Sequence, residues 1–194
     1  MKILWSNLFF AAIIAFACEA ANAHTQTYIF DLSGLAEVPA VATTGSGFAK
    51  ATFDLDLVTM RIEASFSGLL GNTTASHIHC CDFQPNTNAG VATTTPTFTG
   101  FPLGVTSGSY DHTFDMTLAS SYRAAFLTAN GGSVANALAS LLTDLDSGRA
   151  YFNIHTSSFL GGEIRGQAVA IPEPASALLA LAGLGMPWLL RRSR

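Results

Sequence analysis

Apolar and polar side chains alternate without interruption along Met60-Arg61-Ile62-Glu63-Ala64-Ser65-Phe66. A period of two is typical of a β-strand that buries one face. The stretch 48–55 before it follows mostly the same pattern, and 56–59 can join the two stretches as a hairpin. Gly68 then ends the second strand. The chain is therefore expected to be built around antiparallel β-structure.

Further strands are expected on both sides of this hairpin. Alternating or short apolar runs bounded by turn residues predict strands over 28–32, 75–79, 113–118, 150–155 and 163–169. The segment 80–108 carries repeated Pro, Gly and Asn residues, which favour a long loop. Strands along most of the chain predict an all-β fold, an antiparallel β-sandwich with Greek-key-like connections.

The apolar period lengthens to that of a helix near 120–146. Ser120 or Ser121 can cap a short helix that reaches Ala129, and an Asn-Gly-Gly sequence at 130–132 breaks it. Ser133 can cap a second helix with its leucines on one side. We therefore expect one short helical insertion in the sandwich.

The N-terminal segment 1–23 has the three parts of a secretory signal peptide. A lysine precedes an apolar run over 8–17, and Ala21-Asn22-Ala23 places small residues at both recognition positions of a cleavage site. The apolar run is too short to span a bilayer comfortably. We expect cleavage to leave His24 as the first mature residue. A lipid on Cys18 is the alternative, but the leucine that lipoprotein signals usually carry is missing before it.

The C-terminal segment 171–194 has the features of a second targeting segment. Pro172-Glu173-Pro174 precedes an apolar stretch over 175–190, and an arginine cluster ends the chain at Arg191, Arg192 and Arg194. These parts, in this order, resemble the PEP-CTERM sorting signal. The resemblance implies processing by an exosortase-type enzyme in a bacterium that makes extracellular polysaccharide. It also implies transient anchoring of 175–190 in the inner membrane, with the body exported to the periplasm, cell surface or exterior.

The remaining body, 24–170, has the size of one domain. It carries eleven acidic and five basic residues, a net charge of −6. This charge leaves no basic patch for nucleic acid and disfavours binding of the body to an anionic membrane. The sequence has no G-x-S-x-G, no Gly-rich phosphate loop and no cysteine-protease motif. We therefore expect a binding or structural module rather than an enzyme.

Four motifs of the body occur in order: Glu37-Val38-Pro39, Ser76-His77-Ile78-His79, Tyr151-Phe152-Asn153-Ile154-His155-Thr156 and Gly162-Glu163-Ile164-Arg165-Gly166-Gln167. Together they resemble the CHRD domain, over about 28–169. Ala40 stands where the family usually has a second proline. The resemblance implies a β-sandwich but no settled activity. Our leading hypothesis is an exported surface or matrix-associated module that binds extracellular polysaccharide or a surface protein.

The histidines support a second hypothesis. His77 and His79 are two residues apart on one expected strand, so both rings point to one face. His155 lies on a strand close to the last one, and three histidines are a common ligand set for copper or zinc. Glu163 is expected to accept a ring N–H, and Arg165 lies on the same face as Glu163. With Asn153, these residues can also form a polar cluster that binds no metal.

Cys80 and Cys81 leave two alternatives open. The pair matches only a bacterial subset of the CHRD family. A disulfide between adjacent cysteines is strained, because their Cα atoms are closer than most disulfides prefer, yet an oxidising compartment favours it. Alternatively, one thiolate can join His77 and His79 as a soft ligand. We expect the disulfide first.

Overall fold

The structure is a computed structural model that describes residues 24–81 and 87–172. The expected signal peptide, 1–23, and the sorting tail from 173 onward lie outside the described residues. The strands are β1 (Thr25–Ser33), β2 (Ser46–Asp54), β3 (Thr59–Ser67), β4 (Thr73–His79), β5 (Gly108–Asp115), β6 (Tyr151–Thr156), β7 (Ile164–Gln167) and β8 (Val169–Ile171). The helices are α1 (Ala124–Ala129) and α2 (Val134–Asp146), with single 3₁₀ turns at Gly34–Ala36 and Ala119–Ser121.

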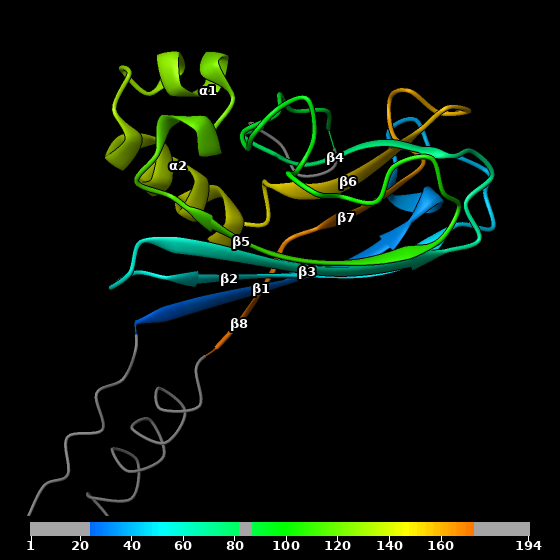
Figure 1. Cartoon of the computed structure of the whole chain (residues 1–194), viewed down its shortest axis with the longest axis horizontal. Coiled ribbons are helices and arrows are strands. Elements are labelled where there is room, and N and C mark those ends of the chain that lie inside the picture. The colour runs from blue at the N-terminus through cyan, green and yellow to red at the C-terminus, as the bar shows by residue number, and fades with distance from the viewer. Residues whose placement is uncertain (1–23, 82–86, 173–194) are drawn as a thin grey trace, which may run out of the picture.

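The eight strands of the described residues belong to one sheet that folds over on itself. Its order is β4-β6-β7-β1-β2-β3-β5, with β8 also paired to β1, and the pairings are antiparallel. β7 meets β1 at the single pair Ser33–Arg165. At this junction the sheet turns, so that β4, β6 and β7 lie over β1, β2, β3 and β5 (Figure 1). The predicted all-β class with a small helical insertion is confirmed.

Aromatic side chains fill the space between the two layers. Phe152 of β6 has its ring centroid 5.8 Å from that of Phe30 on β1 and 5.7 Å from that of Phe98. Phe98 in turn lies 5.3 Å from Phe114 of β5. All four rings are buried. Burial of this apolar surface is the main force that holds the layers together.

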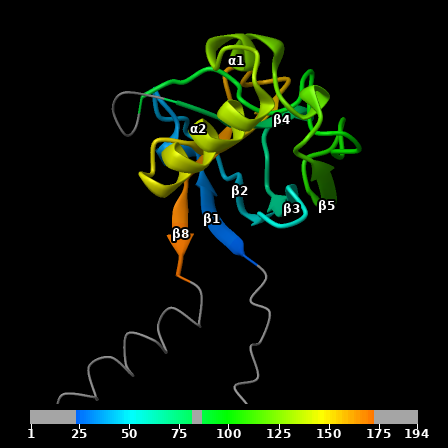
Figure 2. The same cartoon turned by 90° about the vertical axis from the view of Figure 1, so that its left-hand side faces the viewer.

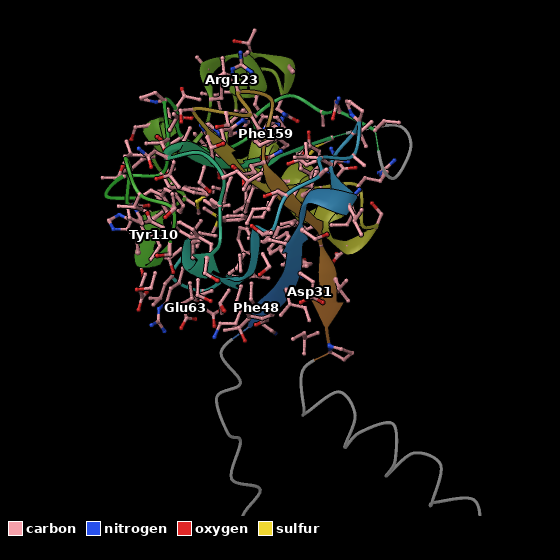
Figure 3. The ribbon with its side chains drawn as sticks, turned by 90° about the vertical axis from the view of Figure 1, so that its right-hand side faces the viewer. Asp31, Phe48, Glu63, Tyr110, Arg123 and Phe159 are labelled. Atoms are coloured by element: carbon pink, nitrogen blue, oxygen red, sulfur yellow. A yellow bond between two sulfur atoms is a disulfide. The ribbon has the colours of Figure 1, made fainter. Side chains whose placement is uncertain are left out.

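The hairpin expected from the alternating stretch is present as β2 and β3. The two strands pair over their whole length, with Ala51 opposite Ile62. Asp54 closes the turn, because its side chain accepts hydrogen bonds from the backbone N–H groups of Asp56 and Leu57 at 3.0 and 2.9 Å. The apolar members of the alternation face the core, and Phe48 and Glu63 lie on the outer side of this layer (Figure 3).

Two expected strands differ from those observed. The predicted strand 113–118 is shifted, because β5 runs from Gly108 to Asp115 and pairs with β3. The predicted strand 163–169 is two strands, β7 and β8, interrupted at Ala168. The N–H of Ala168 donates to the carbonyl of Ala150 at 3.0 Å. The chain there changes partner, from β6 on one layer to β1 on the other.

The helical insertion lies across one end of the sandwich (Figure 2). α2 buries Ala137, Leu141 and Leu145, and the expected cap is observed, because Ser133 accepts from the N–H of Asn136 at 3.3 Å. The expected caps Ser120 and Ser121 are wrong. Both lie in a 3₁₀ turn, and α1 begins only at Ala124 without a side-chain cap.

The outer edge of β4 is covered by the loop that follows it. Ala92 N–H donates to the carbonyl of Ile78 at 3.0 Å, and Phe98 N–H donates to that of Ser76 at 3.1 Å. Hydroxyl groups of the same loop accept from the β4 backbone, with Thr97 bonded to Ser76 N–H at 2.9 Å. The segment expected to be a loop is therefore largely tied to the sheet where it is described.

β1 begins, and β8 ends, at the same edge of the molecule, because Thr27 pairs with Ile171. The two ends of the described body therefore lie side by side (Figure 1). Within the described ranges, neither helix has the length and hydropathy needed to cross a membrane.

Candidate metal centre

The three expected ligands lie on the face of the β4–β6–β7 layer that points away from the core. His77 and His79 alternate along β4 with Ile78, which is fully buried in the core. β6 pairs with β4 so that Ala75 is opposite His155 and His77 is opposite Asn153. Residues directly opposite one another in an antiparallel pair share a face. Strand pleating and this register therefore bring the three rings together.

The rings converge on one point. One nitrogen of each ring lies within 4.8 Å of the others. His79 Nε2 and His155 Nε2 are 3.4 Å apart. The ring centroid of His77 lies 5.4 Å from that of His155 and 5.9 Å from that of His79. The arrangement has the dimensions of a three-imidazole ligand set.

The remaining ring nitrogens bind backbone carbonyls. His77 Nε2 lies 2.8 Å from the carbonyl of Pro96. His79 Nδ1 lies 2.9 Å from that of Ala89, and His155 Nδ1 lies 3.0 Å from that of Leu160. A carbonyl only accepts, so each of these nitrogens must carry the hydrogen, which assigns the tautomer. The lone pairs are then on His77 Nδ1, His79 Nε2 and His155 Nε2.

Burial keeps these rings neutral. It lowers the pKa of His77 and of His79 to about 4, although the carbonyl bonds oppose the shift. Burial also lowers the pKa of His155. Near neutral pH the ring nitrogens that do not bond a carbonyl are therefore acceptors, and His77 Nδ1 is buried with no hydrogen-bond partner. Buried acceptors that face one another without a donor are unfavourable unless a cation joins them.

Glu163 does not accept a ring N–H as expected. Its carboxylate accepts from the hydroxyls of Thr43 and Thr156 at 2.6 and 2.8 Å, and from the N–H groups of Leu70 and Gly71 at 2.6 and 3.0 Å. Burial raises the pKa of Glu163, but these four hydrogen bonds outweigh it and hold the pKa below its usual value. Glu163 therefore links Thr43 and the loop that follows β3 to Thr156 at the end of β6. The ring nitrogens bond backbone carbonyls instead.

Arg165 contacts the histidines through an aromatic ring and does not pair with Glu163. Its guanidinium donates to Asn88 Oδ1 and to the carbonyl of Thr87, each at 3.0 Å. The guanidinium carbon lies 3.7 Å from the ring centroid of Tyr151. Tyr151 stacks on His79 with centroids 4.8 Å apart and planes 7° from parallel. The stack fixes the orientation of the His79 ring.

Glu37, which the sequence did not place in the site, is close enough to Arg165 for the guanidinium charge to oppose the rise in its carboxyl pKa. Glu37 is only 6% exposed, and its Oε2 accepts from Asn153 Nδ2 at 3.5 Å. Burial raises the pKa of Glu37 to about 7, against the opposing effects of Arg165 and Asn153. Glu37 Oε1 and Asn153 Oδ1 are both buried without a partner. The Glu-Val-Pro motif contains this residue, but the motif does not indicate which strand the Glu37 side chain contacts.

The two cysteines form a group separate from the histidines. Cys80 and Cys81 are joined by a disulfide across a cis peptide bond. Their sulfur atoms lie close to a carboxylate oxygen of Asp144, and not with the three imidazoles. The alternative in which one thiolate joins His77 and His79 therefore does not match the geometry, because the side chain of Cys80 is on the core side of the layer.

The model of the CHRD domain matches residues 28–168. No curated protein and no solved structure matches the chain. The match covers most of the chain and includes the four sequence motifs, the three histidines and both cysteines. The chain therefore belongs to the CHRD domain family.

Proposed function

We propose that this CHRD domain binds a copper or zinc ion through His77, His79 and His155. One observation carries the proposal. Three neutral imidazoles each bring a nitrogen within 4.8 Å of the others, and the hydrogen of each ring is already committed to a backbone carbonyl. A cation can bind the lone pairs of all three acceptors at once. A proton added to one ring would leave at least one of the other nitrogens without a partner.

The distances favour an ion of this size. Zinc–nitrogen bonds are about 2.0–2.1 Å long, so two ligands at a tetrahedral angle place their nitrogens about 3.4 Å apart. His79 Nε2 and His155 Nε2 are separated by 3.4 Å. Copper and zinc both accept imidazole ligands readily. Three protein ligands would leave one coordination position for water or another small ligand.

The second part of the proposal concerns location. The signal-like segment 1–23 and the tail 171–194 support an exported module that an exosortase-type enzyme processes. The leading hypothesis of a non-enzymatic surface or matrix protein is compatible with a bound metal. In that case the ion would support the structure or the binding of a partner such as extracellular polysaccharide or a surface protein.

Metal analysis of the exported chain tests the proposal. We expect about one equivalent of copper or zinc in protein purified from its native compartment, and recovery of that stoichiometry when a chelator-stripped sample is titrated. His155→Ala should abolish stoichiometric binding, because it removes one of three ligands. His112→Ala is the matched control, since His112 is on β5 in the other layer. Loss of binding in both variants, or in neither, would contradict the proposed site.

A further inference from the structure

A second group of potential ligands lies on the other side of β4 from the histidines. Cys80 and Cys81 border a pocket of about 380 Å³, together with Arg123, Phe126 and Ser140. Cys81 is partly exposed in this pocket, and its sulfur lies 3.7 Å from Ser140 Oγ of α2. Arg123 is on the side of the molecule opposite Phe48 and Glu63 (Figure 3). The disulfide is therefore accessible to a small molecule from the side of the helices.

Asp144 of α2 supplies a third potential ligand. The two sulfurs and a carboxylate oxygen of Asp144 lie within 4.8 Å of one another. Asp144 is buried, and its Oδ1 lies 2.7 Å from Arg149 Nε. A carboxylate has two acceptor oxygens, so Asp144 can contact Arg149 and a cation at the same time. Two thiolates and one carboxylate, held close together in a pocket, are a ligand set for a borderline-soft divalent ion such as zinc.

We propose that Cys80, Cys81 and Asp144 form a second cation site, which the disulfide closes and reduction opens. In the oxidised chain each sulfur is bonded to the other, so no thiolate is available. After reduction, both sulfurs and the carboxylate can bind one divalent ion of the zinc class. Arg123 at the pocket favours the thiolate form through its positive charge.

The step that opens the site is a thiol–disulfide exchange with a dithiol reductant. A thiolate of the reductant attacks Cys81 Sγ, the more exposed sulfur, and the sulfur–sulfur bond breaks with the electron pair on Cys80. The second thiol of the reductant then displaces Cys81 and leaves the reductant as a disulfide. Two electrons and two protons pass to the cysteines, and the protons are released when the cation binds.

Cadmium is a probe that separates this site from the histidine site. Thiolate ligands give cadmium a charge-transfer absorption, which imidazole ligands do not. The full chain carries Cys18→Ser in every sample, so that Cys80 and Cys81 are its remaining cysteines. We expect the reduced chain to bind one cadmium per chain with this band, and the oxidised chain to show no band. The comparison uses one protein in two redox states and needs no substitution at the proposed ligands.

Substitutions then test the ligands. Cys81→Ser should lower the band of the reduced chain at least by half. Asp144→Asn should keep the band but weaken cadmium binding at least about tenfold. Asp146→Asn is the matched control, because Asp146 is on the same helix but bonds Tyr28 at 2.7 Å. A band of equal strength in the oxidised chain, no band after reduction, or equal weakening by both aspartate variants would overturn the assignment. Failure of metal binding at the histidines would leave this result unaffected.

Discussion

The variant Glu37→Gln should be more stable than the wild-type chain at alkaline pH and about as stable as the wild type at acidic pH. In the structure, Glu37 Oε1 and Asn153 Oδ1 are buried acceptors without partners. Both border Gly162, where an added Cβ would clash with them. A protonated Glu37 carboxyl group supplies a hydrogen-bond donor for these unpaired acceptors. The side-chain amide of glutamine supplies a donor at every pH.

The size of the effect follows from the pKa of Glu37, which burial raises from 4.5 to about 7. For an acid with a raised pKa in the folded state, the stabilising contribution is complete below pH 4.5. It is lost as the pH rises through about 7. Each unit of pKa shift corresponds to about 1.4 kcal/mol. Between pH 5 and pH 8 the wild-type chain should therefore lose about 2–3 kcal/mol relative to Glu37→Gln.

The histidines act in the opposite direction. His77 and His79 have pKa values lowered to about 4, so their contribution is present above pH 6.5 and is lost as the pH falls. Both proteins share this contribution, and it cancels in the difference between them. Urea unfolding of metal-free wild type and variant at the two pH values gives the four free energies needed. A difference between the proteins that stays constant to within about 0.5 kcal/mol across this range would refute a protonated Glu37.

Three further predictions concern the core and the two ends of the chain. Phe152→Ala should lower the free energy of unfolding by about 3–5 kcal/mol, and Phe48→Ala on the outer face by less than about 1 kcal/mol; equal losses in urea unfolding would contradict the two-layer core. A chain that ends at Ile171 should stay soluble with a β-type circular dichroism spectrum, because β8 is complete there; aggregation would show that residues 172–194 belong to the fold. The exported chain should begin at His24 by intact mass, and a mass that retains the first 23 residues would exclude cleavage there.

The strands could largely be predicted because their signals are local. The alternation over 60–66 fixed both the strand and its buried face. The break at Ala168 could not be predicted in this way, because it depends on which layer each half of 163–171 joins. The same limit applies to β5, whose position is set by pairing with β3 and not by its own apolar run.

The candidate site could be predicted in part for a similar reason. The spacing of His77 and His79 determines that they share a face, and a third histidine nearby needs only a neighbouring strand. Glu163 was assigned the wrong partners, because its donors include the backbone N–H groups of Leu70 and Gly71. Every residue except proline has a backbone N–H group, so the sequence does not indicate which of these groups a carboxylate will bind. Glu37 was missed as a site residue because the loop after β1 approaches β6 only through the fold.

The covered edge of β4 has a consequence for the behaviour of many copies held close together. An open strand edge offers hydrogen-bonding groups that a strand of another chain can pair with. Here Ala92 and Phe98 of the same chain already donate to the β4 backbone. Damage that detaches this segment would free a template for strand addition while both layers stay folded. Concentration-dependent self-association would then be detected before the β-sandwich unfolds.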